Sequence, residues 1–168
     1  MRILYAGVLA LLGLTQPAHA EDVLQKFIGV WVAEGWVRPH GFDAPEKIRC
    51  KVKGSRMSNL QISFAGRCAT TSGARAFRLL IAQDAAGQRF AAKVKVSMSG
   101  ADIEYAGIKQ AKQIVLTQET PVESGPRLLV SEITLDMADE TIGMRNLLTD
   151  QNTDKQMQSL EITFSQRP

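Results

Sequence analysis

Apolar and polar residues alternate along most of the chain, and the alternation is clearest between residues 47 and 53. Three apolar residues alternate there with four cationic ones: Lys47, Arg49, Lys51 and Lys53. Successive side chains of a strand point to opposite faces. This stretch therefore predicts a strand with one core face and one cationic face.

Similar segments recur down to the C-terminus, separated by turns rich in Gly, Asp, Asn and Ser. Leu60, Ile62 and Phe64 repeat the pattern, and we expect all three in the core. Over residues 128–137 the alternation changes phase near Ser131, which predicts a β-bulge. In the last strand the expected core face consists of three residues: Leu160, Ile162 and Phe164.

About ten short strands follow one another without a helical crossover. This succession predicts an all-β fold, an antiparallel up-and-down barrel of about 8–10 strands. A sandwich is the alternative arrangement, and closure is attractive because it leaves no open edge. A short N-terminal helix over 21–26 should precede the strands, capped by Asp22, with Leu24 and Phe27 facing the core.

The first strand contains both tryptophans of the chain, Trp31 and Trp36. Their separation by five residues places them on opposite faces of that strand. Trp31 shares its face with Ala33, and Trp36 shares the other face with Glu34. Both faces are largely apolar, which is typical of a strand that contacts more than one layer.

Residues 1–20 have the features of a secretory signal peptide. A positive start at Arg2 precedes an apolar run over 3–14, and Ala18-His19-Ala20 is a small-x-small cleavage site. The apolar run is shorter than the roughly 20 residues of a membrane span. We therefore expect cleavage near Ala20, a periplasmic or secreted product, a single barrel domain over 21–168, and no transmembrane segment in the mature chain.

The two cysteines, Cys50 and Cys68, suit an exported protein because disulfides persist in oxidising compartments. Each shares its phase with the apolar residues of its own strand, so a bond between them would link neighbouring strands from the core side. It would contribute about 3 kcal/mol in the chain-entropy view. A free thiol pair or an intermolecular bridge are the alternatives.

Charge is distributed unevenly along the chain. Without residues 1–20, the chain has 19 basic and 17 acidic residues, too small an excess to indicate nucleic acid. Residues 41–95 contain 11 basic and 3 acidic residues, whereas residues 96–168 contain 6 and 11. A cationic outer face is therefore expected from six residues: Lys47, Arg49, Lys51, Lys53, Lys93 and Lys95. A solvated exterior is the simpler interpretation of this face, and an anionic partner is the alternative.

No combination of residues indicates catalysis or a cofactor. His40, the only histidine after residue 20, lies in a Pro- and Gly-rich loop. Asp136, Asp139 and Glu140 cluster at an expected turn, where solvated acids are common. The acidic spacing from Asp150 to Asp154 is similar to that of a calcium loop but lacks its glycine, so no metal site is expected. We expect a protein that is not an enzyme and has no cofactor.

The opening segment Phe27-x-Gly29-x-Trp31 after a short helix resembles the signature of the calycin superfamily, which includes lipocalins and fatty-acid-binding-protein-like barrels. The resemblance implies that Trp31 closes one end of a barrel, with Arg145 or Arg167 lying across it. We group Trp36 with this candidate ligand and plug site.

Two functions are compatible with these observations. The first is an exported, non-enzymatic barrel that binds a small hydrophobic or amphipathic ligand in its interior. The alternative is a periplasmic inhibitor or envelope interaction module that contacts an anionic envelope component or protein through the cationic face. Neither interpretation involves nucleic acid.

Overall fold

The computed structural model describes residues 22–38, 44–96, 102–119 and 128–167. The predicted signal peptide and His40 lie outside these ranges. One short helix, η1, precedes ten strands: η1 Val23–Phe27, β1 Gly29–Val37, β2 Glu46–Ser58, β3 Gln61–Thr70, β4 Gly73–Gln83, β5 Arg89–Val96, β6 Ile103–Gln110, β7 Gln113–Gln118, β8 Leu128–Met137, β9 Thr141–Asp150 and β10 Gln156–Gln166.

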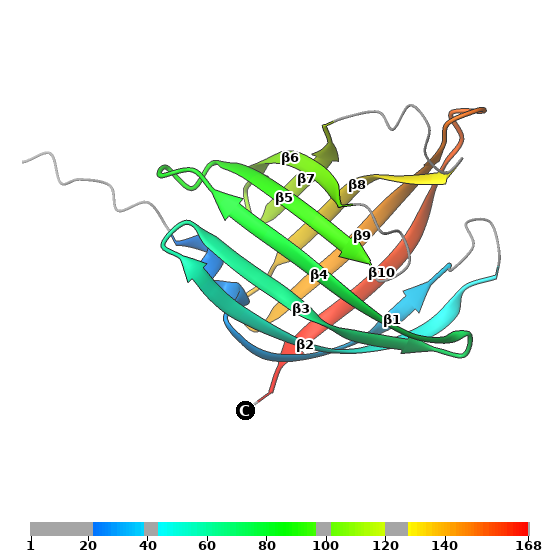
Figure 1. Cartoon of the computed structure of the whole chain (residues 1–168), viewed down its shortest axis with the longest axis horizontal. Helices are drawn as coiled ribbons and strands as arrows, with labels where there is room; N and C mark the ends of the chain where they lie inside the picture. The colour runs from blue at the N-terminus through cyan, green and yellow to red at the C-terminus, as the bar shows by residue number, and fades with distance from the viewer. Residues whose placement is uncertain (1–21, 39–43, 97–101, 120–127, 168) are drawn as a thin grey trace, which may run out of the picture.

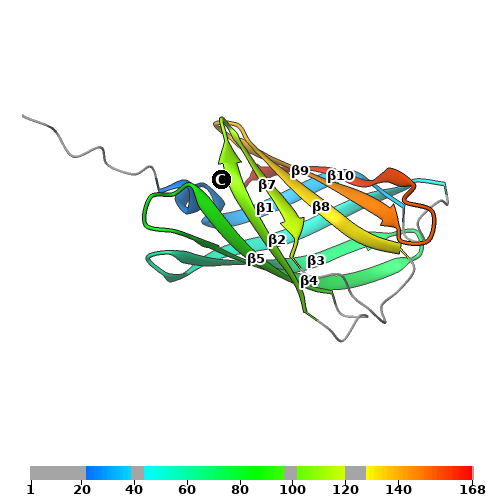
Figure 2. The ribbon, with the colours of Figure 1, turned by 90° about the horizontal axis from the view of Figure 1, so that it is seen from above.

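The ten strands form one closed antiparallel barrel, as the sequence predicts (Figure 1). Each strand pairs with the next along the chain, and β1 closes the ring by pairing with both β2 and β10. The strands run obliquely around a long molecule (Figure 2). Because every strand has two partners, the barrel has no free edge.

The N-terminal helix differs in detail from the prediction. It is a 3-10 helix over Val23–Phe27 rather than a helix over 21–26, and the Asp22 side chain makes no capping hydrogen bond. Asp22 instead accepts a 2.7 Å hydrogen bond from Arg56 Nη2 in β2, which also donates to Gln25 at 2.8 Å. Leu24 and Phe27 are fully buried, as expected.

Two glycines allow η1 to lie close against the barrel. Gly29 has a φ of +128°, a conformation that side chains disfavour, at the change of direction from η1 into β1. A Cβ atom on Gly54 would lie 1.6 Å from the carbonyl oxygen of Phe27. The chain after η1 can therefore rest directly on β2 only because that position has no side chain.

The predicted bulge near Ser131 is confirmed, since the register of β8 against β9 shifts between Val130 and Glu132. The prediction that Leu60 faces the core is wrong. Leu60 lies in the turn between β2 and β3 and is 42% exposed, because the strand alternation begins only after it. Ile62 and Phe64 are fully buried, as expected.

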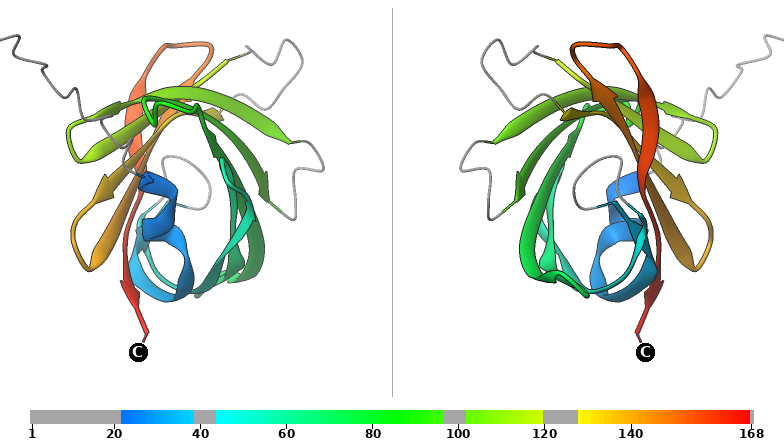
Figure 3. Two further views of the ribbon diagram at one scale, coloured as in Figure 1. Left: turned by 90° about the vertical axis from the view of Figure 1, so that its left-hand side faces the viewer. Right: turned by 90° about the vertical axis from the view of Figure 1, so that its right-hand side faces the viewer.

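The two ends of the barrel differ. Figure 3 shows η1 inside the ring of strands at one end. At the same end, Phe64 makes edge-to-face contacts with three aromatic rings. The centroid distances are 5.6 Å to Phe27, 6.4 Å to Trp31 and 5.1 Å to Phe164. These four side chains fill the barrel there, and we call this the closed end. None of the helices in the described part of the chain is both long and apolar enough to cross a membrane.

Candidate functional site

A cavity of about 420 Å³ occupies the barrel at the end opposite η1. Its wall is mostly aliphatic and aromatic, and it comes from strands all around the barrel. The main apolar lining residues are Val37, Ile48, Phe77, Leu79, Val94, Ile133, Met144, Leu160 and Ile162. The size and the apolar wall are typical of a small-molecule pocket.

Four polar side chains also line this cavity: Thr70, Ser72, Arg75 and Asn146. Arg75 has the inward phase, because it pairs with Cys68 across β3 and β4. It is exposed at the cavity mouth, and among the described residues it has no carboxylate within salt-bridge distance. Among the described lining residues, the only charged group is therefore a cation without a salt bridge.

Asn146 contributes the second notable polar group. Its side-chain oxygen Oδ1 is buried and has no hydrogen-bond partner. Leu160 and Ile133 flank Asn146 on the neighbouring strands, and both line the same cavity. A buried polar atom without a partner is costly. This oxygen is available to accept a hydrogen bond from a molecule in the cavity.

The predicted disulfide is present and forms part of the cavity wall. Cys50 and Cys68 lie directly opposite each other on β2 and β3, with Cα atoms 4.0 Å apart and an S–S bond. Cys50 is buried, and Cys68 lines the cavity. The bond fixes the register of two strands that carry cavity residues.

A carboxylate organises the rim of the cavity. Glu46 accepts hydrogen bonds from the Thr71 hydroxyl at 2.7 Å, from the Ser72 amide at 3.1 Å and from the Ser72 hydroxyl. The Ser72 and Thr71 hydroxyls lower the pKa of Glu46 from 4.5 to about 2. Hydrogen bonds that favour the charged carboxylate cause this shift. Glu46 therefore holds the β3–β4 turn beside the mouth.

The predicted plug residues separate into two groups. Phe27 and Trp31 are buried at the closed end next to Gly29, and the Trp31 indole N–H donates a 3.0 Å hydrogen bond to the Phe27 carbonyl. Trp36 lies on the outer face of β1, opposite Lys47 and Glu161, with the Arg38 guanidinium 5.6 Å from its ring centroid. Strand alternation keeps Trp36 out of the barrel interior.

Neither of the two expected arginines, Arg145 and Arg167, lies across Trp31. Arg145 is exposed on β9, where its guanidinium forms a 3.0 Å salt bridge with Asp136. Arg167 is exposed beyond the end of β10 and lines a groove on the outer surface. Arg145 has the outward phase of β9. The Phe27 carbonyl takes the hydrogen bond of the indole instead.

The cationic face is divided by ion pairs that only the structure shows. Three of the six predicted residues are neutralised: Arg49 by Glu34 at 3.1 Å, Lys93 by Glu104 at 2.8 Å and Lys95 by Asp102 at 3.8 Å. The hydrogen bond that Lys93 donates to Glu104 also raises the pKa of Lys93. Lys47, Lys51 and Lys53 are exposed, and among the described residues they have no acidic partner.

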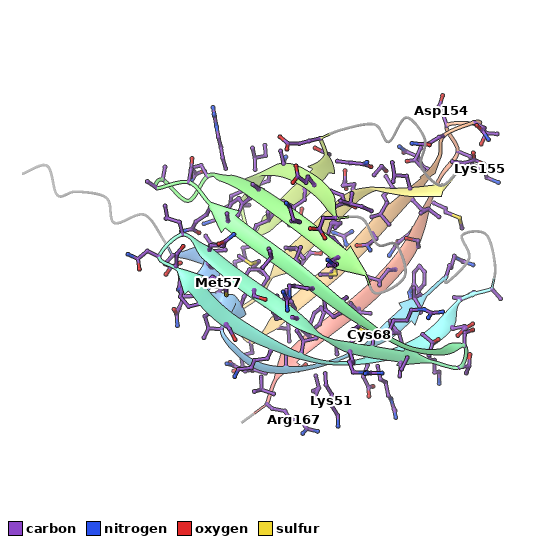
Figure 4. All side chains as sticks on the ribbon, in the orientation of Figure 1. Lys51, Met57, Cys68, Asp154, Lys155 and Arg167 are labelled. Carbon is purple, nitrogen blue, oxygen red and sulfur yellow. A yellow bond between two sulfur atoms is a disulfide. The ribbon has the colours of Figure 1, made fainter. Side chains whose placement is uncertain are left out.

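Residues 22–38, 44–96, 102–119 and 128–167 contain no group of three His, Cys, Asp or Glu side chains that could hold a metal ion. The residues from Asp150 to Lys155 form a turn between β9 and β10. Within it, Asp150 accepts a 2.9 Å hydrogen bond from the backbone amide of Asn152. Asp154 and Lys155 lie at the end of the barrel away from η1 (Figure 4).

Neither known protein families nor curated proteins match this chain. Solved structures do match. The crystal structure of Rv2717c from M. tuberculosis has a TM-score of 0.68 and 9% sequence identity, covering 90% of this chain and 99% of that chain. The structure of EF1p2_mFAP2b bound to DFHBI has a TM-score of 0.50 and 8% identity, covering 88% and 99%. At these identities the likeness shows a shared β-barrel fold.

Proposed function

We propose that this protein binds a small, largely apolar ligand in the cavity at the open end of its barrel. The observation that carries the proposal is the combination of an apolar cavity of about 420 Å³ with an unpartnered buried oxygen on Asn146. A ligand that fills the cavity would remove apolar surface from water. A donor on the same ligand would satisfy Asn146.

Arg75 defines the polar end of the ligand. An unpaired guanidinium at the mouth favours a carboxylate, sulfonate or phosphate group, which it can hold with two parallel hydrogen bonds. The ligand is therefore amphipathic, with its apolar part inside and its anionic group at the mouth. EF1p2_mFAP2b, a protein of similar fold, is bound to the small molecule DFHBI, which supports small-molecule binding by a barrel of this kind.

The role is that of a binding protein rather than an enzyme. Among the described residues that line the cavity, Arg75 is the only one with a charged side chain, so the lining offers no general base or nucleophile–base pair. The resemblance of the segment from Phe27 to Trp31 to the calycin opening supports the same role. Export is part of the proposal, supported by the residue pattern of 1–20 and by the disulfide.

The test uses two fluorescent probes with similar apolar bodies. Anilinonaphthalene sulfonate carries an anionic group, and N-phenylnaphthylamine is neutral. We expect saturable binding of both, and Arg75→Gln should weaken binding of the sulfonate by about tenfold, the loss expected for one charge-assisted hydrogen bond. The neutral probe should bind the variant as it binds the parent.

A blocking variant tests the location of the bound probe. Leu160→Trp adds bulk at the cavity wall, whereas Thr163→Trp adds the same ring on the exposed outer face of β10. Loss of both probes in Leu160→Trp alone supports the cavity. Equal binding by the two folded variants would overturn the proposal. Native mass spectrometry of protein purified from its own host should reveal a small co-purifying molecule that leaves on denaturation.

A further inference from the structure

A second concave site lies on the outside of the barrel, over β1, β2 and β3. This outer groove has a volume of about 470 Å³, and its floor includes Val32, Ala69 and Ala74. The disulfide of Cys50 and Cys68 lies beneath it. The groove forms because short outward side chains on β1, β3 and β4 lie beside long cationic ones.

Four cationic residues line the outer groove: Arg49, Lys51, Arg67 and Arg167. Glu34 is the only acidic residue among the described residues of the lining, and it already pairs with Arg49 at 3.1 Å. Among the described residues, Lys51, Arg67 and Arg167 have no carboxylate within salt-bridge distance. The groove therefore has three cations that no described part of the chain neutralises.

Two of these cations face each other directly. Lys51 on β2 pairs with Arg67 on β3, and both side chains point outward. Directly opposite residues have Cβ atoms about 5 Å apart, and like charges in such pairs destabilise the sheet. Arg167 approaches from the other side, since its backbone amide donates to Val30 on β1 at 2.9 Å. Figure 4 shows Lys51 and Arg167 projecting from the same side of the barrel.

This arrangement suits a compact anion with more than one negative charge. A guanidinium offers a planar fork of donors, and an ammonium offers a point charge. A phosphate group has several oxygens, so it can accept from Lys51 and Arg67 at once and relieve their repulsion. A single carboxylate has fewer oxygens and half the charge, and it would leave part of the cluster unneutralised.

We propose that the outer groove is a binding site for a phosphate-bearing anion, held by Lys51, Arg67 and Arg167. The site is separate from the cavity, because its cations point away from the barrel interior. The phosphate can belong to a free polyphosphate or to a lipid headgroup that ends in a phosphomonoester. Both present a terminal phosphate with three free oxygens and more than one negative charge to the three cations.

The experiment is a calorimetric titration with tripolyphosphate at about 0.15 M ionic strength, where charges more than about 8 Å apart are largely screened. The test variant is Lys51→Gln/Arg67→Gln. The matched control, Lys47→Gln/Lys112→Gln, removes the same charge from exposed positions outside the groove. We expect the test variant to bind at least about tenfold more weakly, the loss of one charge-assisted hydrogen bond. The control should change by less than about twofold, as expected for screened, distant charges.

A second arm identifies the source of the phosphate. Co-sedimentation with vesicles of phosphatidylcholine and phosphatidic acid, whose headgroup is a phosphomonoester, assigns a lipid headgroup if it is lost in the test variant and absent with pure phosphatidylcholine. Binding of tripolyphosphate without vesicle binding assigns a soluble anion. Equal loss in the two double variants, or no binding by the parent, would overturn the site. Both double variants should still bind the cavity probes, so this result is independent of the ligand-binding proposal.

Discussion

The indole nitrogen of Trp31 lies 3.0 Å from the backbone oxygen of Phe27, four residues earlier, and donates a hydrogen bond to it. The carbonyl belongs to the last residue of η1, and the indole belongs to the third residue of β1. Both residues are almost fully buried. The bond therefore joins the helix at the closed end to the barrel wall.

Trp31→Phe should destabilise the protein by about 2–4 kcal/mol, because it leaves the Phe27 carbonyl without a donor and opens a small void. Trp36→Phe is the matched control, because Trp36 lies on the outer face and contacts Arg38. The control should cost less than about 1 kcal/mol. Urea unfolding of both variants measures the difference, and equal midpoints would show that Trp31 does not secure the closed end.

The disulfide should contribute about 3 kcal/mol, since it closes a loop across a sequence separation of 18 residues. Cys50→Ala/Cys68→Ala should therefore unfold at a lower denaturant concentration than the oxidised parent. A reducing agent should lower the midpoint of the parent and leave the double variant unchanged. A parent that is insensitive to reduction at its midpoint would argue that strand pairing alone sets the register of β2 and β3.

The strands and the disulfide were predictable because alternation records which face of a strand is buried. Cys50 alternates with cationic residues, so its inward phase is visible in the sequence. The alternation alone does not predict the cavity, because an alternating strand is compatible with a packed interior and with a hollow one. The difference depends on the side chains that meet across the barrel, such as Phe64 with Phe164 at the closed end.

The polar residues of the cavity were missed for a related reason. Arg75 and Arg78 lie in the same segment, and the sequence alone does not show which of the two points inward. Only the pairing of Arg75 with Cys68 reveals its inward phase. Asn146 follows the exposed Arg145, and the register of its strand pairs shifts nearby, between Gln158 and Leu160. The unpaired charge of Arg67 and Lys51 likewise depends on cross-strand neighbours, which local sequence patterns do not contain.

Acidic pH should destabilise the β3–β4 turn at the cavity rim, because it protonates the Glu46 carboxylate. Its pKa is about 2 in the folded protein and 4.5 in the absence of hydrogen bonds, so its contribution is fully present above pH 4.5 and is lost as the pH falls toward 2. Glu46→Gln should flatten this part of the stability profile, measured as urea midpoints against pH. Thr71→Val/Ser72→Ala should flatten it too, because it removes the hydroxyl donors. An unchanged acid limb in both variants would contradict this role.

Alkaline pH should destabilise the protein by ionising Tyr105. The hydroxyl of this residue donates a 2.9 Å hydrogen bond to the Val130 carbonyl. Burial raises the pKa of Tyr105 from 10 to about 12. Its contribution to stability is therefore fully present below pH 10 and is lost as the pH rises to 12. Tyr105→Phe should cost about 1–2 kcal/mol at neutral pH. It should also remove this alkaline dependence, and phenolate absorbance of the parent near pH 10 in the folded state would contradict the burial.

Asn146 provides the sharpest separation of stability from function. Its unpartnered oxygen costs stability in the empty protein, so Asn146→Leu should raise the free energy of unfolding by about 1–2 kcal/mol. The same change removes the acceptor inside the cavity, so a ligand with a buried donor should bind the variant more weakly. Urea unfolding and probe titration measure the two effects. If Asn146 only supports the fold, its replacement should lower the free energy of unfolding. A variant that is more stable but binds the ligand more weakly would show that Asn146 is retained for a ligand.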